Sequence, residues 1–144
     1  MTTTVVIDKN LRASAQKAWA AIESVGGLDR WFPIIETCRV EGSGEGALRV
    51  MTLAGGAGEI SDRIVEIAPQ ERRLRYHRTH HPFPVSDYFG TVEVFDGGSG
   101  ASRLLWTVRF EAAQEDEAAV RDLVHNAISD GIDGLERELI AEAP

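Results

Sequence analysis

The stretch that decides the fold is ALRVMTLAGGAGEISDRIVEI, residues 47–67. Two segments rich in β-branched and apolar residues flank Gly55-Gly56, which is typical of a tight hairpin turn. Such a turn sets the register, so that Arg49 faces Asp62 and Met51 faces Ile60. One face then carries Arg49, Met51, Leu53, Ile60, Asp62 and Ile64. Because this is the more apolar face, we expect it to point inward, with the opposed arginine and aspartate on it.

Turn-forming residues divide the sequence on both sides of this hairpin into further short strands. Strands are predicted at Ile35–Glu41, Ala47–Leu53, Glu59–Ile67, Arg72–His80, Ser86–Phe95 and Arg103–Ala112. Short connections between consecutive strands favour antiparallel pairing, so these six strands are expected to form a meander.

Helices are predicted at both ends of the meander. A short strand at Thr3–Asp8 precedes Ser14, which is a good N-cap for a helix that Gly26-Gly27 ends. A second short helix at Leu28–Phe32 and a long amphipathic helix at Glu115–Glu142 complete the pattern. The order β-αα-β6-α predicts an α+β fold, a curved antiparallel sheet wrapped around the long C-terminal helix. The length of 144 residues favours one domain, residues 1–144.

Two glycines lie where larger residues would be expected in a filled core. A loop centred on Ser99 pairs Val92 with Trp106. The same register places Gly90 opposite Val108, where it leaves a gap among bulky neighbours. The apolar stripe of the last helix consists of Val120, Leu123, Val124, Ala127, Ile128, Gly131, Leu135 and Leu139. Gly131 there indicates either close helix–sheet contact or room for a ligand, and both interpretations stay open.

Composition excludes several classes of partner. The net charge of −8 argues against binding to nucleic acid or to an anionic membrane surface. The basic cluster at residues 72–81 is interpreted as a solvated strand face. The single cysteine, Cys38, rules out an internal disulfide. We find neither a run of 18 apolar residues nor a secretion signal, so we expect no membrane insertion and a cytoplasmic location.

Four stretches, taken in their order and spacing, are similar to a known superfamily. They are Ser14–Trp19 with Trp31-Phe32-Pro33, Gly46–Arg49, Pro84–Tyr88 and Leu105–Phe110. The chain resembles the START-related, Bet v 1-like (SRPBCC) superfamily, and within it the bacterial polyketide cyclase/dehydrase-like branch. The resemblance implies a helix-grip fold with a deep cavity for lipids, hormones or polyketides. It also implies an entrance framed by Ala54–Gly58 and His81–Val85, and it carries no universal catalytic motif.

Arg49 and Asp62 are the candidate catalytic residues. In a dry cavity the pair could move a proton beside a carbonyl and stabilise an enolate, or it could simply order the sheet. Tyr76 and Arg78 could supply hydrogen bonds to ligand oxygens at the polar end of their strand. The predicted ligand-binding residues are Trp31, Met51, Ile60, Tyr76, Arg78, Tyr88, Trp106, Val124 and Ile128. No cofactor and no metal is expected, because strand alternation sends His77 and His80 to opposite faces.

Three functions are compatible with these patterns. The first is binding of a small apolar or aromatic molecule between sheet and helix, which an interior with no void larger than a water or two would contradict. The second is a polyketide cyclase or dehydratase that acts by proton transfer in the same cavity. The third is a protein-interaction module, which a large external apolar patch would favour. A homodimer is also left open.

Overall fold

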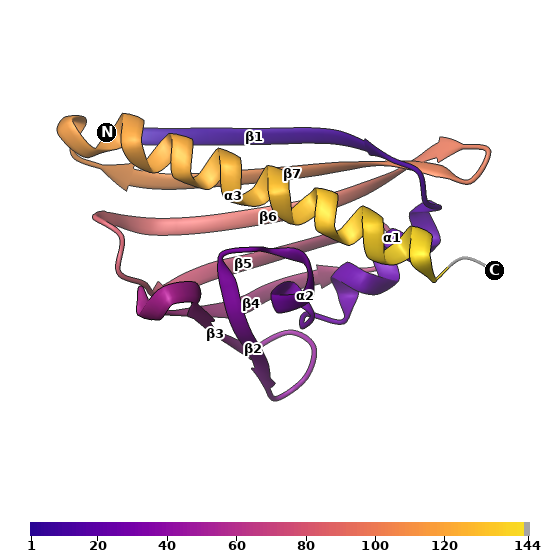
Figure 1. Ribbon diagram of the computed structural model, residues 1–144, viewed down its shortest axis with the longest axis horizontal. Helices are drawn as coiled ribbons and strands as arrows, with labels where there is room; N and C mark the ends of the chain where they lie inside the picture. The colour runs from indigo at the N-terminus through magenta and orange to yellow at the C-terminus, as the bar shows by residue number, and fades with distance from the viewer. Residues whose placement is uncertain (143–144) are drawn as a thin grey trace.

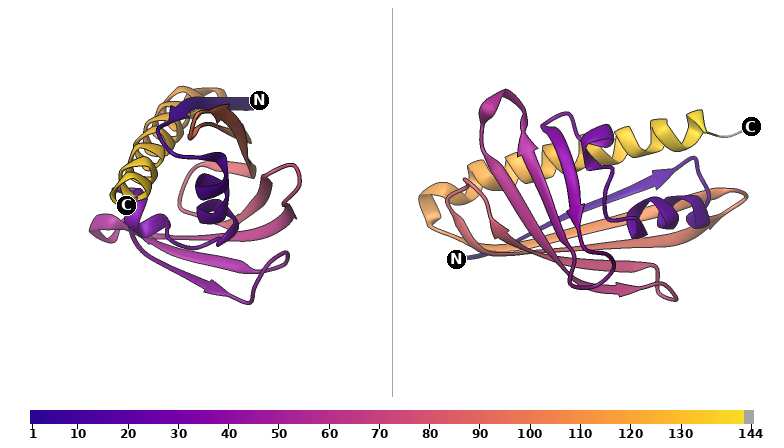
Figure 2. Two further views of the ribbon diagram at one scale, coloured as in Figure 1. Left: turned by 90° about the vertical axis from the view of Figure 1, so that its right-hand side faces the viewer. Right: turned by 90° about the horizontal axis from the view of Figure 1, so that it is seen from below.

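The computed structural model describes residues 1–142 of the chain (Figure 1). Its elements are β1 (Thr2–Leu11), α1 (Ala15–Glu23), α2 (Leu28–Trp31), β2 (Ile35–Glu41), β3 (Leu48–Leu53), the 3₁₀ turn η1 (Ala54–Gly56), β4 (Glu59–Ala68), β5 (Arg73–His80), β6 (Val85–Gly98), β7 (Ala101–Ala112) and α3 (Gln114–Ala141). All strand pairs are antiparallel, in the order β1-β7-β6-β5-β4-β3-β2. The sheet curves around α3, as Figure 2 shows, which confirms the predicted fold class.

The hairpin of β3 and β4 has the predicted register. Arg49 pairs with Asp62 and Met51 pairs with Ile60. The turn is possible because Gly55 and Gly56 have φ values of 71° and 70°, a left-handed conformation that costs glycine little. All six residues of the face expected to point inward are buried.

The hairpin of β6 and β7 has the predicted pairing but is longer than expected. Val92 pairs with Trp106, and Gly90 pairs with Val108. The turn contains only Ser99 and Gly100, both at positive φ, as in the hairpin turns whose twist matches that of the strands. The glycines before this turn were expected to form a loop; instead they continue the strand.

The first helix begins where the sequence predicts and ends earlier. The Ser14 hydroxyl accepts a hydrogen bond from the amide of Lys17, 3.1 Å away, as an N-cap does. The helix ends at Glu23, before the glycines that were expected to end it. Val25 ends the turn instead, with a φ of 70°, an unusual conformation for a β-branched residue.

The long helix α3 lies along β1, and its C-terminal half contacts α2 (Figure 1). The Lys9 ammonium joins β1 to α3 through the Ser129 hydroxyl and the Asp133 carboxylate, at 2.9 and 2.6 Å. The expectation that Leu123 is part of the buried stripe was wrong, since this residue lies at the edge of the stripe and is 42% exposed. Within residues 1–142, no helix is both long enough and apolar enough to span a membrane.

Candidate functional site

A small hollow lies between the sheet, α2 and the N-terminal half of α3. Its volume is about 40 Å³. Since a water molecule needs about 10–15 Å³, the hollow has room for about three waters. It is lined by Leu28, Phe32, Ile34, Ile35, Ile60, Tyr76, Arg78, Phe83, Tyr88, Trp106, Leu123, Val124, Ala127 and Ile128. The interior is therefore not completely filled, but the deep cavity that the resemblance implied is absent from the described part of the chain in this conformation.

Phe32 occupies much of the space that a deeper cavity would need. A Cβ added at Gly131 would lie 2.5 Å from the Phe32 ring. The ring also packs edge-on against Trp106, with centroids 5.6 Å apart. The space at Gly131 is therefore filled by an aromatic ring from the end of α2, and the expected close contact between this helix and the sheet is not the one observed at this position.

The two loops that were expected to frame the entrance lie against each other, and one of them contributes Phe83 to the hollow. A Cβ on Gly58 would lie 3.0 Å from Pro82, so the β3–β4 and β5–β6 connections touch. Phe83, half-buried, reaches from the second loop into the lining. Its amide donates a hydrogen bond to Nδ1 of His81, 3.1 Å away, and the two rings stack with centroids 5.8 Å apart. This contact holds Phe83 in place over the hollow.

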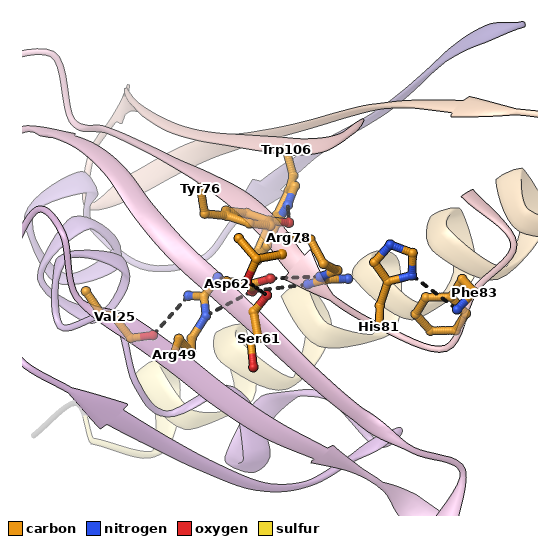
Figure 3. A network of polar contacts seen from close by, with 10 residues as sticks. Val25, Arg49, Ser61, Asp62, Tyr76, Arg78, His81, Phe83 and Trp106 are labelled. Carbon is orange, nitrogen blue, oxygen red and sulfur yellow. Dashed lines mark hydrogen bonds and ion pairs between the residues drawn. The ribbon is translucent and has the colours of Figure 1, made fainter. Parts of the chain in front are cut away.

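A buried ion cluster adjoins the hollow on its sheet side (Figure 3). Asp62 is fully buried and lies between Arg49 and Arg78. Nε and Nη2 of Arg78 donate to its two carboxylate oxygens at 2.8 and 3.2 Å, and Nη2 of Arg49 donates to Oδ2 at 3.0 Å. Both carboxylate oxygens are therefore occupied by guanidinium groups.

The charges of the cluster fix its protonation states. Burial by itself would raise the pKa of Asp62, but the charges of Arg78 and Arg49 outweigh burial and hold this pKa below its ordinary value. Burial would lower the pKa of Arg78, but the charge of Asp62 raises it above its ordinary value. At neutral pH the cluster thus contains one carboxylate and two guanidinium ions. Asp62 in this state is a poor proton acceptor.

Arg49 also holds the strained turn after α1. Its Nη1 donates to the carbonyl oxygen of Val25, 3.0 Å away. This carbonyl points at the cluster because Val25 has a left-handed conformation, which is costly for a β-branched residue. The hydrogen bond to a buried cation helps to offset that cost, and it gives Arg49 a structural role independent of any chemistry.

Two tyrosines connect the cluster to the hollow. The Tyr76 ring lies across Gly90, where any Cβ would overlap it, so the gap expected at Gly90 is filled by Tyr76. Its hydroxyl accepts a hydrogen bond from Nε1 of Trp106 at 3.1 Å. The Arg78 guanidinium lies 4.5 Å from the centroid of Tyr88. Burial raises the pKa of both tyrosines, so both hydroxyls stay protonated at neutral pH.

The structure brings together most of the predicted site residues. Ile60, Tyr76, Arg78, Tyr88, Trp106, Val124 and Ile128 all line the hollow. Arg49, Asp62, Met51 and Trp31 are buried outside the lining. Trp31 turns toward α3, where its Nε1 donates to the Glu138 carboxylate at 2.7 Å. It therefore anchors α2 to the long helix.

Sequence reasoning did not predict that Phe32 lines the hollow, and it included His81 and Phe83 only as part of the segment His81–Val85 expected at the entrance, without their contact. Phe32 belongs to the Trp31-Phe32-Pro33 stretch that carries the family resemblance, which was the one available signal for it.

Within residues 1–142 no three histidine, cysteine or acidic side chains gather as a metal site would require. Burial raises the pKa of the half-buried Cys38, so its thiol is unsuited to act as a nucleophile.

A curved antiparallel sheet that grips a long C-terminal helix, with an apolar hollow between them, defines the helix-grip class of ligand-binding domains. The chain belongs to the family described as polyketide cyclase / dehydrase and lipid transport, whose model matches residues 2–139. This confirms the resemblance found in the sequence. A comparison with curated proteins finds no match.

Solved structures with the same fold come from bacteria and a plant. The protein XoxI from Bacillus cereus is 24% identical, with a TM-score of 0.85 and 96% of each chain covered. An uncharacterized protein from Bacillus thuringiensis is 24% identical, with a TM-score of 0.84 over 96% of this chain and 99% of the other. Norcoclaurine synthase from Thalictrum flavum, in complex with dopamine and hydroxybenzaldehyde, is 16% identical, with a TM-score of 0.82 over 100% of this chain and 90% of the other.

Proposed function

We propose that the protein binds a small apolar or aromatic molecule between the sheet and α3. The observation that carries this proposal is the composition of the hollow, whose lining is apolar and aromatic except for one guanidinium group. Ligand pockets in proteins combine a mostly apolar wall with a few polar groups that orient the ligand. The family description, which includes lipid transport, supports the same class of ligand.

The hollow must widen before it can accept such a molecule. Its volume is about 40 Å³, whereas a cavity of about 150 Å³ is needed to hold benzene. Phe83 and Leu123 are the lining residues best able to move, because both are partly exposed at the mouth. Norcoclaurine synthase, described in complex with two single-ring compounds, supports the idea that this fold can hold ligands of that size.

Proton-transfer catalysis is the second candidate, and the family description favours it by naming cyclases and dehydrases. In its sequence-based form it depends on Asp62, so that Asp62→Asn would abolish turnover and change ligand affinity only a few-fold. The geometry supports a different pair for one part of this role, the stabilisation of an enolate, and neither member of that pair is a proton acceptor at neutral pH. Arg78 and Tyr88 line the hollow and could donate hydrogen bonds to an enolate oxygen, whereas both oxygens of Asp62 are occupied.

The third candidate, an interaction module, has less support. Of the large apolar side chains exposed on the strands, Val65 lies at a bulge of β4, and the others have polar partners on the neighbouring strand. Val6 pairs with Thr107, Phe89 with Arg109 and Phe95 with Arg103. Such isolated apolar residues are ordinary on protein surfaces.

Titration with N-phenyl-1-naphthylamine, an uncharged fluorescent probe, tests the proposal. We expect saturable binding of one probe per chain. Ala127→Phe should abolish it, because Ala127 lines the hollow and the larger ring would fill it. Asn126→Phe is the matched control, since Asn126 is the exposed neighbour on the same helix. Absence of saturable binding to the wild type, or equal binding by both variants, would contradict the proposal.

A further inference from the structure

The ion cluster beside the hollow contains more positive than negative charge. Arg49, Asp62 and Arg78 bring two guanidinium groups and one carboxylate into the interior. Asp62 is 0% exposed, and the side chains of Arg49 and Arg78 are 4% and 11% exposed. Buried charges are ordinarily paired, because each charge removed from water loses its hydration. Among residues 1–142, Asp62 is the one carboxylate in ion-pair contact with these two guanidinium groups, so the cluster carries one excess positive charge.

The two arginines differ in how completely their donors are used. Arg49 donates through Nε and Nη2 to Asp62 and through Nη1 to the Val25 carbonyl. Arg78 donates through Nε and Nη2 to Asp62, while its Nη1 has no acceptor among residues 1–142. Arg78 is also the arginine that lines the hollow. The excess positive charge is shared by the cluster, and the unused donor belongs to Arg78, at the ligand-facing end of the cluster.

The lining around Arg78, as far as residues 1–142 describe it, supplies no second anion to the cluster. Within the described chain, Arg78 is the one charged residue of the lining, and no carboxylate lies among the other thirteen residues. The rings of Tyr76 and Tyr88 lie 5.6 and 4.5 Å from its guanidinium carbon. Such aromatic faces stabilise a cation but supply no counter-charge. Nε and Nη2 of Arg78 already donate to Asp62, so Nη1 is the donor group left for a ligand carboxylate.

We infer that the ligand of this site is a carboxylic acid, an apolar ring or chain whose carboxylate accepts hydrogen bonds from Arg78. The inference rests on the proposed function, since it assigns a chemical class to the molecule that the widened hollow would hold. The carboxylate would complete the cluster with two anions facing two cations, and the apolar part would lie against Val124, Ile128 and Trp106.

A pair of ligands of equal shape tests the inference by isothermal titration at pH 7.5. 2-Naphthoate carries the carboxylate, and 2-naphthamide is its uncharged counterpart. We expect the wild type to bind the acid about tenfold more tightly or better, as a charge-assisted hydrogen bond in a buried site would give. Arg78→Met should lose this preference while binding the amide within about threefold of the wild type. Arg75→Met, on the exposed face of the same strand, should change neither affinity.

The outcomes separate this inference from the proposed function. If the wild type binds the acid no better than the amide, the inference is overturned and the ligand-binding proposal stands. If neither naphthalene compound nor N-phenyl-1-naphthylamine binds, both the ligand-binding proposal and the inference of a carboxylic acid ligand are overturned. Arg78→Met is expected to fold, because Asp62 keeps Arg49 as a partner. If Arg78→Met does not fold, Arg78→Lys replaces it; this variant keeps the positive charge and must retain at least part of the preference for the acid. The comparison of the two ligands on the wild type requires no variant.

Discussion

The Phe32 ring packs directly against the backbone of Gly131, so closely that a Cβ on the glycine would lie 2.5 Å from the ring. This contact joins the end of α2 to the middle of α3. It also determines how much of the interior is empty, because the ring occupies space that a larger hollow would include.

Gly131→Ala should therefore destabilise the protein. Alanine ordinarily stabilises a helix by about 1 kcal/mol relative to glycine. Here its methyl group must displace a buried ring, and overpacking of that kind costs about 1–3 kcal/mol. Urea unfolding will measure the change. Asp130→Ala, at an exposed neighbouring position, should change the free energy of unfolding by no more than about 0.5 kcal/mol. A Gly131→Ala protein at least as stable as the wild type would disprove the contact.

Phe83→Ala should make the hollow easier to enter. Phe83 is half-buried at the mouth, so its removal opens a path without emptying the core. We expect the association rate of N-phenyl-1-naphthylamine to rise several-fold in stopped-flow fluorescence. Phe95→Ala is the control, because Phe95 is an exposed phenylalanine that does not line the hollow. A slower rate would mean that Phe83 forms part of the path by which the probe enters.

Asp62→Asn should cost about 3–5 kcal/mol of stability at pH 7, since it leaves two buried guanidinium groups without a counter-charge. Glu66→Gln is a matched control on the same strand, where the pair with Arg73 is screened by solvent and contributes little to stability. Urea unfolding will measure the loss of unfolding free energy in each variant. Equal losses would show that the buried cluster contributes no more to stability than the exposed pair.

The comparison of the wild type with Asp62→Asn also predicts a pH dependence of stability. The pKa of Asp62 is lower in the folded protein than its ordinary value of 3.8. Its contribution to stability is therefore complete above that value and is lost as the pH falls through the lowered pKa. The difference in unfolding free energy between the wild type and Asp62→Asn should shrink as the pH is lowered below 3.8. A difference that stays constant would show that the carboxylate charge is not its source.

His81 should titrate below its ordinary pKa of 6.5. Burial lowers this pKa, and the charges of Arg78 and His80 lower it further; together they outweigh the smaller opposite effects of the Phe83 backbone and of Asp62. Since the folded protein prefers neutral His81, stability should be highest above pH 6.5 and fall as the pH drops below it. Protonated Nδ1 also cannot accept from the Phe83 amide. NMR titration will give the pKa, and His81→Gln should remove this part of the pH dependence.

Much of the fold follows from local sequence signals. Glycines at the β3–β4 turn and alternating apolar residues set the Arg49–Asp62 register, and Ser14 marks the start of α1. The pairing of β1 with β7 could not be predicted, because no local signal joins strands so far apart in the chain.

The site was harder to predict than the fold, for two physical reasons. The Asp62–Arg78 pair depends on a bulge at Val65, since Ile64 pairs with Tyr76 while Glu66 pairs with Arg75. Without that extra residue Asp62 would not lie opposite Arg78. The volume of the hollow depends on where the Phe32 ring packs, and a sequence shows only that Gly131 leaves space, not which group fills it.

The edge position of β1 has a consequence for how the chain acquires its structure. Residues 2–11 pair along their whole length with residues 102–111, so β1 has no partner until β7, the last strand of the sheet, has been synthesised. Contacts so distant along the chain slow folding. The helix that covers the concave side of the sheet is made later still. During synthesis, the concave face of the sheet that lines the hollow is therefore uncovered, and it becomes enclosed only when α3 docks against it.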